Sequence, residues 1–243
     1  MHRAFLFLAV ACLAVSAACG GGSGPTAPTP KVPRISRTRF LAFGDSITAG
    51  EVTSPVGATG GVGKLVVVPT ASYPTVLQSR LAATYTAQAT SISVTNSGVS
   101  NEPILDGVPR FNEVFPSSRA EVVLLQDGVN GLNFVGPDTS TGLMRIMVQQ
   151  AKNGSAKVFV GSMIPTVPGR PRATVSPAAL VTYNGVLQIM CRQEGVTYVD
   201  LYDAMLADAS TLIGADGLHP TEAGYRRIAD LFFSAIRTEL EEP

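Results

Sequence analysis

The fold of this chain is decided at Arg39-Phe-Leu-Ala-Phe-Gly-Asp-Ser-Ile-Thr-Ala-Gly50. Its first half, Phe40–Phe43, is a short apolar run that predicts a buried strand. The run stops at Gly44, and Asp45 and Ser46 follow where the strand passes into a turn and a helix. In open α/β sheets, ligands and reacting groups gather at the carboxyl ends of strands. Ser46 is therefore a candidate nucleophile, although the same residues could serve only to cap the next helix.

Strand-like and helix-like segments alternate through the rest of the chain, and several of the strand-like runs lack polar alternation. Such runs are typical of strands that are covered on both faces. The pattern predicts one α/β domain, a three-layer α/β/α sandwich whose mostly parallel sheet has about five strands and is wound as in flavodoxin. Besides 40–43, we expect strands at 92–96, 122–125, 157–161 and 196–201, a short extra strand at 64–69, and helices at 72–85, 141–152, 178–194 and 221–240.

The first eighteen residues have the pattern of an export signal. A basic start is followed by the apolar run Ala4–Val15 and by small residues suited to cleavage. Cleavage after Ala18 would leave Cys19 first, which resembles a bacterial lipoprotein signal with a lipidated cysteine. Ser16 stands where such signals usually carry leucine, so ordinary secretion stays open. We expect an exported protein that is held at the cell envelope, in the periplasm or outer membrane, or is secreted.

Residues 19–37 are rich in Gly and Pro and predict a linker, which places the folded domain at 38–243. Basic and acidic residues balance at 18 each, which argues against a nucleic-acid partner or an anionic membrane surface. We expect contact with a membrane only through a lipid on Cys19, and we expect a monomer. Cys191 is the one cysteine beyond Cys19, and its helical context predicts a buried, inert thiol.

Asp216-Gly-Leu-His219 holds the second group of candidate residues. His219 is the only histidine beyond the export signal, and an imidazole is the natural general base near neutral pH. A carboxylate three residues earlier, across a glycine turn, can reach Nδ1 and hold the ring in the tautomer that accepts a proton from Ser46. Taken alone, this segment could be a turn followed by a helix cap.

Gly98 and Asn130 follow two other expected strands and are candidate hydrogen-bond donors. Acyl transfer needs donors aimed at the oxyanion that develops in the transition state. A glycine lets its N–H approach a substrate closely, and an asparagine side chain can donate a further bond. Each residue taken separately is also commonplace in a turn.

Together these segments resemble the four short blocks of the SGNH or GDSL hydrolase family of serine esterases and lipases, in the family's order across the folded region. The resemblance implies Ser46 as nucleophile, His219 as base and Asp216 as the residue that orients it. It also implies an oxyanion hole formed by the N–H groups of Ser46 and Gly98 and by the side chain of Asn130. The matching blocks are Gly44-Asp45-Ser46, Asn96-Ser-Gly98-Val-Ser100, Gly128-Val-Asn130 and Asp216-Gly-Leu-His219.

Two positions depart from the pattern of the family. Gly131 stands where many members carry Asp, and Asn101 stands where many carry Gly. Neither replaces a catalytic group, so the departures bear on the shape of the site near the oxyanion hole.

Other enzyme classes fit the sequence less well. The elbow Gly-x-Ser-x-Gly, a Walker loop and the dinucleotide fingerprint are absent from the sequence, and we expect no cofactor and no metal. We expect hydrolysis of small or medium acyl esters, such as O-acylated carbohydrates, with residues 51–71 and 165–177 bordering the site. An O-acyltransferase on envelope glycans and a non-catalytic envelope binding protein remain as alternatives.

Overall fold

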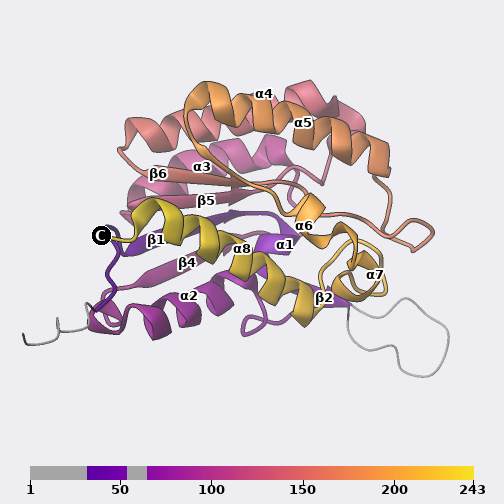
Figure 1. Ribbon diagram of the computed structural model, residues 1–243. Coiled ribbons are helices and arrows are strands. Elements are labelled where there is room, and N and C mark those ends of the chain that lie inside the picture. Colours follow the sequence, from indigo (N-terminus) through magenta and orange to yellow (C-terminus); the bar gives the residue numbers. More distant parts are fainter. Residues whose placement is uncertain (1–31, 54–64) are drawn as a thin grey trace, which may run out of the picture. The chain divides into compact units, whose positions relative to one another are not determined.

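The computed structural model describes residues 32–53 and 65–243 (Figure 1). The predicted export signal at 1–18, Cys19 and most of the expected linker lie outside the described residues. Ile35, which sequence analysis placed in the linker, is buried in the hydrophobic core and forms a bridge with Glu241. The folded part of the chain therefore includes residues before 38, because an apolar side chain there has a core to pack against.

The central sheet has five parallel strands in the order β4-β1-β5-β6-β7. This is the winding that the sequence predicted: β4 lies on one side of β1, and the chain then continues with β5, β6 and β7 on the other side. The strands are β1 (Arg39–Gly44), β4 (Ser93–Gly98), β5 (Val122–Gln126), β6 (Lys157–Gly161) and β7 (Thr197–Val199).

Helices cover both faces of the sheet, which confirms the three-layer sandwich (Figure 1). The two helices of one face pack on each other through the rings of Tyr73 and Phe232, which stack with centroids 5.2 Å apart. Those two are α2 (Tyr73–Thr84) and α8 (Glu222–Leu240), and the other face carries α3 (Ile104–Ser118), α4 (Leu132–Asn153) and α5 (Pro177–Glu194).

The core lies on both sides of β5, the central strand, in which every residue is buried. Its sequence, Val-Val-Leu-Leu-Gln, lacks polar alternation because neither face meets water. β1 beside it is buried from Phe40 to Gly44. The strands that hold the site are therefore fixed by apolar packing on two faces.

Sequence analysis missed α3. Pro109 and Pro116 lie within it, and because proline is disfavoured inside helices, the sequence of this segment does not predict one. Ile104, Phe111 and Phe115 nevertheless form its buried face. The other differences are in extent: α4 begins nine residues earlier than expected and contains a non-helical Gly136, and β7 spans only three residues.

Short elements complete the described part of the chain. The expected extra strand is present as β3 (Leu65–Val67), which pairs antiparallel with β2 (Glu51–Thr53). The remaining elements are α1 (Ser46–Ala49), η1 (Thr86–Gln88), α6 (Tyr202–Leu206) and α7 (Ala209–Leu212). Among the described residues, no helix combines the length and the apolar character that crossing a bilayer requires.

Candidate active site

Ser46 lies at the point where β1 gives way to α1, at the carboxyl edge of the sheet. The Asp45 carboxylate caps α1 by accepting a hydrogen bond from the Ile47 N–H at 2.9 Å. Gly44 pairs in register with Gly98 of β4 and with Gln126 of β5, and a Cβ at Gly44 would collide with the Gln126 carbonyl oxygen. The glycine therefore lets the chain turn tightly between two neighbouring strands.

The structure brings Ser46, His219 and Asp216 into one hydrogen-bonded chain. The Ser46 Oγ lies 2.9 Å from His219 Nε2, and His219 Nδ1 lies 2.6 Å from the Asp216 Oδ2. All three side chains are almost completely buried. Ser46 comes from the start of α1, while the other two come from the loop before α8, 170 residues or more away in sequence.

Asp216 is held as a carboxylate by the turn that contains it. Its Oδ1 accepts hydrogen bonds from the N–H groups of Leu218 and His219, each at 3.0 Å. Burial opposes ionisation, but the bond to the His219 ring and these backbone bonds outweigh it, so the pKa of Asp216 lies below its ordinary value. A carboxylate in this position favours the tautomer with a proton on Nδ1, leaving Nε2 free to accept the Ser46 proton.

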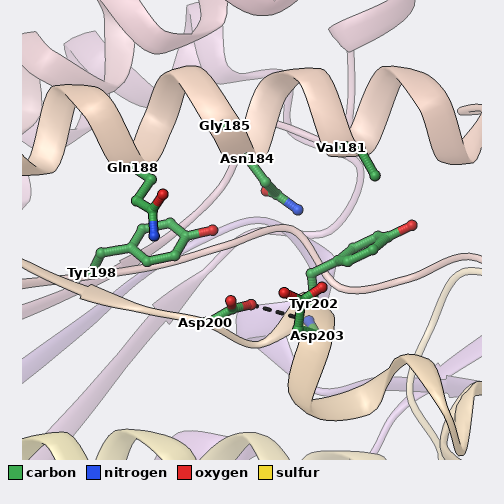
Figure 2. A pocket seen from close by; sticks show the side chains of 8 residues that line it. All are labelled: Val181, Asn184, Gly185, Gln188, Tyr198, Asp200, Tyr202 and Asp203. Atoms are coloured by element: carbon green, nitrogen blue, oxygen red, sulfur yellow. Dashed lines mark hydrogen bonds between the residues drawn. The ribbon is translucent and has the colours of Figure 1, made fainter.

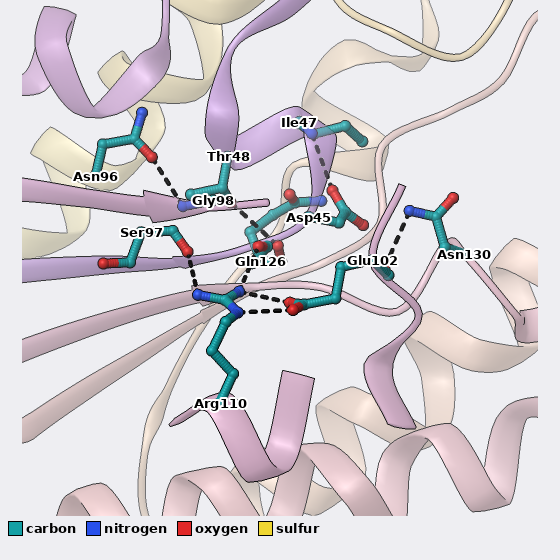
Figure 3. A network of polar contacts seen from close by, with 11 residues as sticks. Asp45, Ile47, Thr48, Asn96, Ser97, Gly98, Glu102, Arg110, Gln126 and Asn130 are labelled. Atoms are coloured by element: carbon teal, nitrogen blue, oxygen red, sulfur yellow. Dashed lines mark hydrogen bonds and ion pairs between the residues drawn. The ribbon is translucent and has the colours of Figure 1, made fainter. Parts of the chain in front are cut away.

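The two further donor candidates lie at the end of β4 and after β5, the strands on either side of β1, but point to protein acceptors in this structure (Figure 3). The Gly98 N–H donates to Asn96 Oδ1 at 2.9 Å, and Asn130 Nδ2 donates to the Glu102 carbonyl at 3.2 Å. A Cβ at Gly98 would collide with the backbone of Ala49 in α1. Gly98 therefore keeps β4 close to the helix that begins with the nucleophile.

Glu51, the first residue of the segment 51–71 that was expected to border the site, is a site residue to which the sequence assigned no role. Its Oε2 lies 3.3 Å from His219 Nε2, and its side chain is only 14% exposed. The Glu51 carbonyl accepts a hydrogen bond from the Tyr225 hydroxyl of α8 at 2.6 Å, which fixes the backbone of β2 at this point. The imidazole thus lies between two carboxylates. The sequence signal was weak, because an acid five residues after a candidate nucleophile belongs to none of the four blocks.

Arg110 of α3 is a residue that sequence analysis missed. Its guanidinium pairs with Glu102, with Nε 2.7 Å from Oε1, and donates to the carbonyl oxygens of Ser97 at 2.9 Å and Gly44 at 3.2 Å (Figure 3). It also lies over the Phe43 ring, 3.9 Å from the centroid. Arg110 therefore ties the ends of β1 and β4 together just before the nucleophile.

Two further acids are completely buried behind the nucleophile. Burial raises the pKa of Asp45 to about 6, although its bond from the Ile47 N–H and the nearby His219 act in the opposite direction. Burial also raises the pKa of Asp127, helped by the negative charge of Asp45. Neither carboxyl oxygen of Asp127 has a hydrogen-bond partner among the described residues. These acids are therefore costly to ionise.

A separate pocket of about 180 Å³ lies between α5 and the end of β7 (Figure 2). Tyr198, Asp200, Tyr202 and Asp203 line it, and none of the sequence-predicted site residues does. Among the described residues there is also no group of three or more His, Cys, Asp or Glu side chains arranged to hold a metal ion.

Comparison with known proteins agrees with this geometry. A sequence profile of the GDSL-like Lipase/Acylhydrolase family matches residues 42–227. A GDSL lipase of Mycobacterium tuberculosis is 36% identical over 80 residues, which span 32% of this chain and 34% of that protein. The chain thus covers about a third of the length of this curated relative.

Solved structures share the fold at lower identity. The lipase/acylhydrolase from Enterococcus faecalis has a TM-score of 0.68 and 22% identity, with 84% of this chain and 97% of that chain covered. A catalytic mutant of an acetylxylan esterase from Geobacillus stearothermophilus has a TM-score of 0.64 and 22% identity, with 83% and 94% covered. This chain belongs to the GDSL-like lipase/acylhydrolase family.

Proposed function

We propose that this chain is a serine ester hydrolase that works through an acyl-enzyme on Ser46. The observation that supports the proposal is the hydrogen-bonded chain from Ser46 through His219 to Asp216. Ser46 Oγ attacks the ester carbonyl carbon while its proton passes to His219 Nε2. The tetrahedral intermediate then expels the alcohol, which takes that proton, and leaves the acyl group on Ser46.

Water completes the cycle by the same route. It attacks the acyl carbon and gives one proton to His219 Nε2, and that proton returns to Ser46 Oγ as the acid leaves. Asp216 stays ionised throughout and stabilises the imidazolium, a role that its lowered pKa supports. The ester is thereby converted into an alcohol and a carboxylic acid without a cofactor.

The oxyanion would be held by the N–H groups of Ser46 and Gly98 and by Asn130. Ser46 is the first residue of α1, where N–H groups have no partner inside the helix. Asn130 uses one donor on the Glu102 carbonyl, and its Nδ2 carries a second hydrogen. The Gly98 N–H would exchange its bond to Asn96 for one to the oxyanion.

The substrates that we propose are small or medium acyl esters of carbohydrates. The structural likeness to an acetylxylan esterase supports this class, together with an expected location in the cell envelope. We also propose export and a lipid on Cys19, on the sequence pattern alone. An O-acyltransferase would use the same first half-reaction and pass the acyl group to a sugar hydroxyl.

The test is hydrolysis of vinyl acetate by the full mature chain and by two serine variants. Ser46→Ala is expected to abolish most turnover, whereas Ser79→Ala, at an exposed position of α2, is expected to keep it. Wild-type turnover by Ser46→Ala would refute the assignment. Product analysis with a sugar added as acceptor separates the two reactions, because hydrolysis releases acetate and transfer makes a new sugar ester.

A further inference from the structure

A pocket of about 320 Å³ opens between the ends of three strands, beside the proposed oxyanion hole. Asn101 and Pro103 line it after β4, Asn130 lines it after β5, and Thr174 and Val175 line it from the loop after β6. β1, which ends at Gly44 just before Ser46, lies between β4 and β5 in the sheet. The pocket therefore lies beside the place where an ester must bind for Ser46 to reach it.

The walls of this pocket are neutral and contain several hydrogen-bonding groups. None of the lining residues carries a charge, although Asn101, Asn130, Asn133 and Thr174 supply amide and hydroxyl groups. Asn133 Nδ2 donates to the Thr174 carbonyl at 3.0 Å, which fixes the two sides of the pocket to each other. Neutral amides and hydroxyls suit hydroxyl groups of a ligand and offer no counter-charge to a phosphate or carboxylate.

Phe134 supplies a flat apolar surface at the same pocket. Its side chain is 92% exposed, whereas no other large hydrophobic side chain among the described residues is more than 55% exposed. It lies in the first turn of α4, before the non-helical Gly136, and lines the pocket with Asn133. An aromatic ring left uncovered beside a site is typical of a binding surface.

We propose that this pocket binds the sugar part of an acylated glycan, with a pyranose ring stacked on Phe134 and its hydroxyl groups bonded to Asn101, Asn133 and Thr174. The inference rests on the proposed function and adds the residues that select the alcohol. The apolar C–H face of a pyranose covers the Phe134 ring, and its hydroxyl edge meets the amides. An alkyl acyl chain is the competing occupant, but it would cover these amides without giving them hydrogen bonds.

The experiment compares three substrates with the full mature chain: acetylated xylo-oligosaccharide, vinyl acetate and vinyl octanoate. Phe134→Ala and Phe134→Leu should raise the KM for the oligosaccharide relative to that for vinyl acetate by roughly three- to tenfold, the range of one aromatic contact. Phe134→Tyr keeps the ring and should keep the wild-type ratio. Ile146→Ala, at an exposed hydrophobic position further along α4, is the matched control and should change neither KM.

Binding without turnover gives a second measurement. Calorimetry on Ser46→Ala with deacetylated xylo-oligosaccharide should show binding that weakens by a similar factor when Phe134→Ala is added.

Four outcomes distinguish the two proposals. Phe134→Ala could instead raise the KM for vinyl octanoate relative to that for vinyl acetate and leave the kinetics with the oligosaccharide unchanged. That result would assign the pocket to the acyl chain and overturn the inference. A wild-type enzyme that hydrolyses vinyl acetate but neither binds nor hydrolyses the oligosaccharide would also overturn it, while leaving the ester hydrolase intact. Absence of all ester turnover would refute the proposed function, whereas oligosaccharide binding that depends on Phe134 would still support the pocket.

Discussion

Replacement of Asp45 by Asn should make the protein more stable at neutral pH, although Asp45 belongs to the block that contains the nucleophile. The Asn side chain keeps an oxygen that can accept the Ile47 N–H and cap α1. It removes a carboxyl group that is completely buried and whose Oδ2 has no hydrogen-bond partner among the described residues. The change therefore preserves the local backbone and removes only the cost of a buried charge.

The size of the effect follows from the pKa of Asp45, which burial raises from 3.8 to about 6. Between these two values the folded protein keeps the proton while the unfolded chain loses it. Because the folded state then binds more protons, the free energy of unfolding of the wild type falls as pH rises from about 4 to about 6. At about 1.4 kcal/mol per pKa unit, the full loss is ~3 kcal/mol.

The assay is urea unfolding followed by circular dichroism at several pH values from 4 to 7, for the wild type and for Asp45→Asn. The difference in unfolding free energy should shift in favour of the variant by up to ~3 kcal/mol across this range and then level off. Asp138→Asn, at an exposed position, serves as the control and should show no such trend. If the unfolding free energies of Asp45→Asn and the wild type changed in parallel with pH, the buried Asp45 carboxyl would not have the raised pKa on which the prediction depends.

The remaining predictions concern the site and the N-terminus. Asp216→Asn should lower kcat by about 10⁴, since the amide no longer enforces the tautomer that accepts the Ser46 proton; steady-state kinetics within tenfold of the wild type would contradict this. Glu51→Gln should lower kcat, because a neutral amide beside Nε2 stabilises the imidazolium formed during attack less well than a carboxylate; an unchanged kcat would count against the contact of 3.3 Å. Gly98→Ala should lower the free energy of unfolding by about 1–3 kcal/mol, because its Cβ meets the backbone of Ala49; an unchanged urea midpoint would show that the close approach is absent. Cys19→Ser should release the protein from the membrane fraction, and a wild-type chain that mass spectrometry finds unmodified at Cys19 would exclude the lipid anchor.

Much of the fold could be predicted because short segments of the sequence indicate their own secondary structure. Phe40–Phe43 and Val122–Leu125 are uninterrupted apolar runs, and each is a buried strand of the central sheet. The order of the strands followed from the alternation of strands and helices, which restricts the winding to a few forms. In contrast, α3 could not be predicted from the sequence. Pro109 and Pro116 lie inside it, and proline normally indicates the end of a helix, so the apolar residues of its buried face were not recognised as helical.

Only the site residues that belong to the four short sequence blocks of the family could be predicted. Ser46, Asp216 and His219 were found because their types and spacing match a known chemistry, and the structure places them in contact. Glu51 and Arg110 reach the site through packing of β2 and α3, which no spacing in the sequence encodes.

The most direct test of the central claim is to label the full mature chain with a fluorophosphonate, which reacts with an activated serine, and to locate the adduct by mass spectrometry. We expect one adduct, on the peptide that contains Ser46. The adduct should disappear in Ser46→Ala and be lost or form much more slowly in His219→Ala, because without the imidazole the hydroxyl is a weak nucleophile. An adduct on another residue, together with undiminished ester hydrolysis by Ser46→Ala, would show that Ser46 is not the nucleophile.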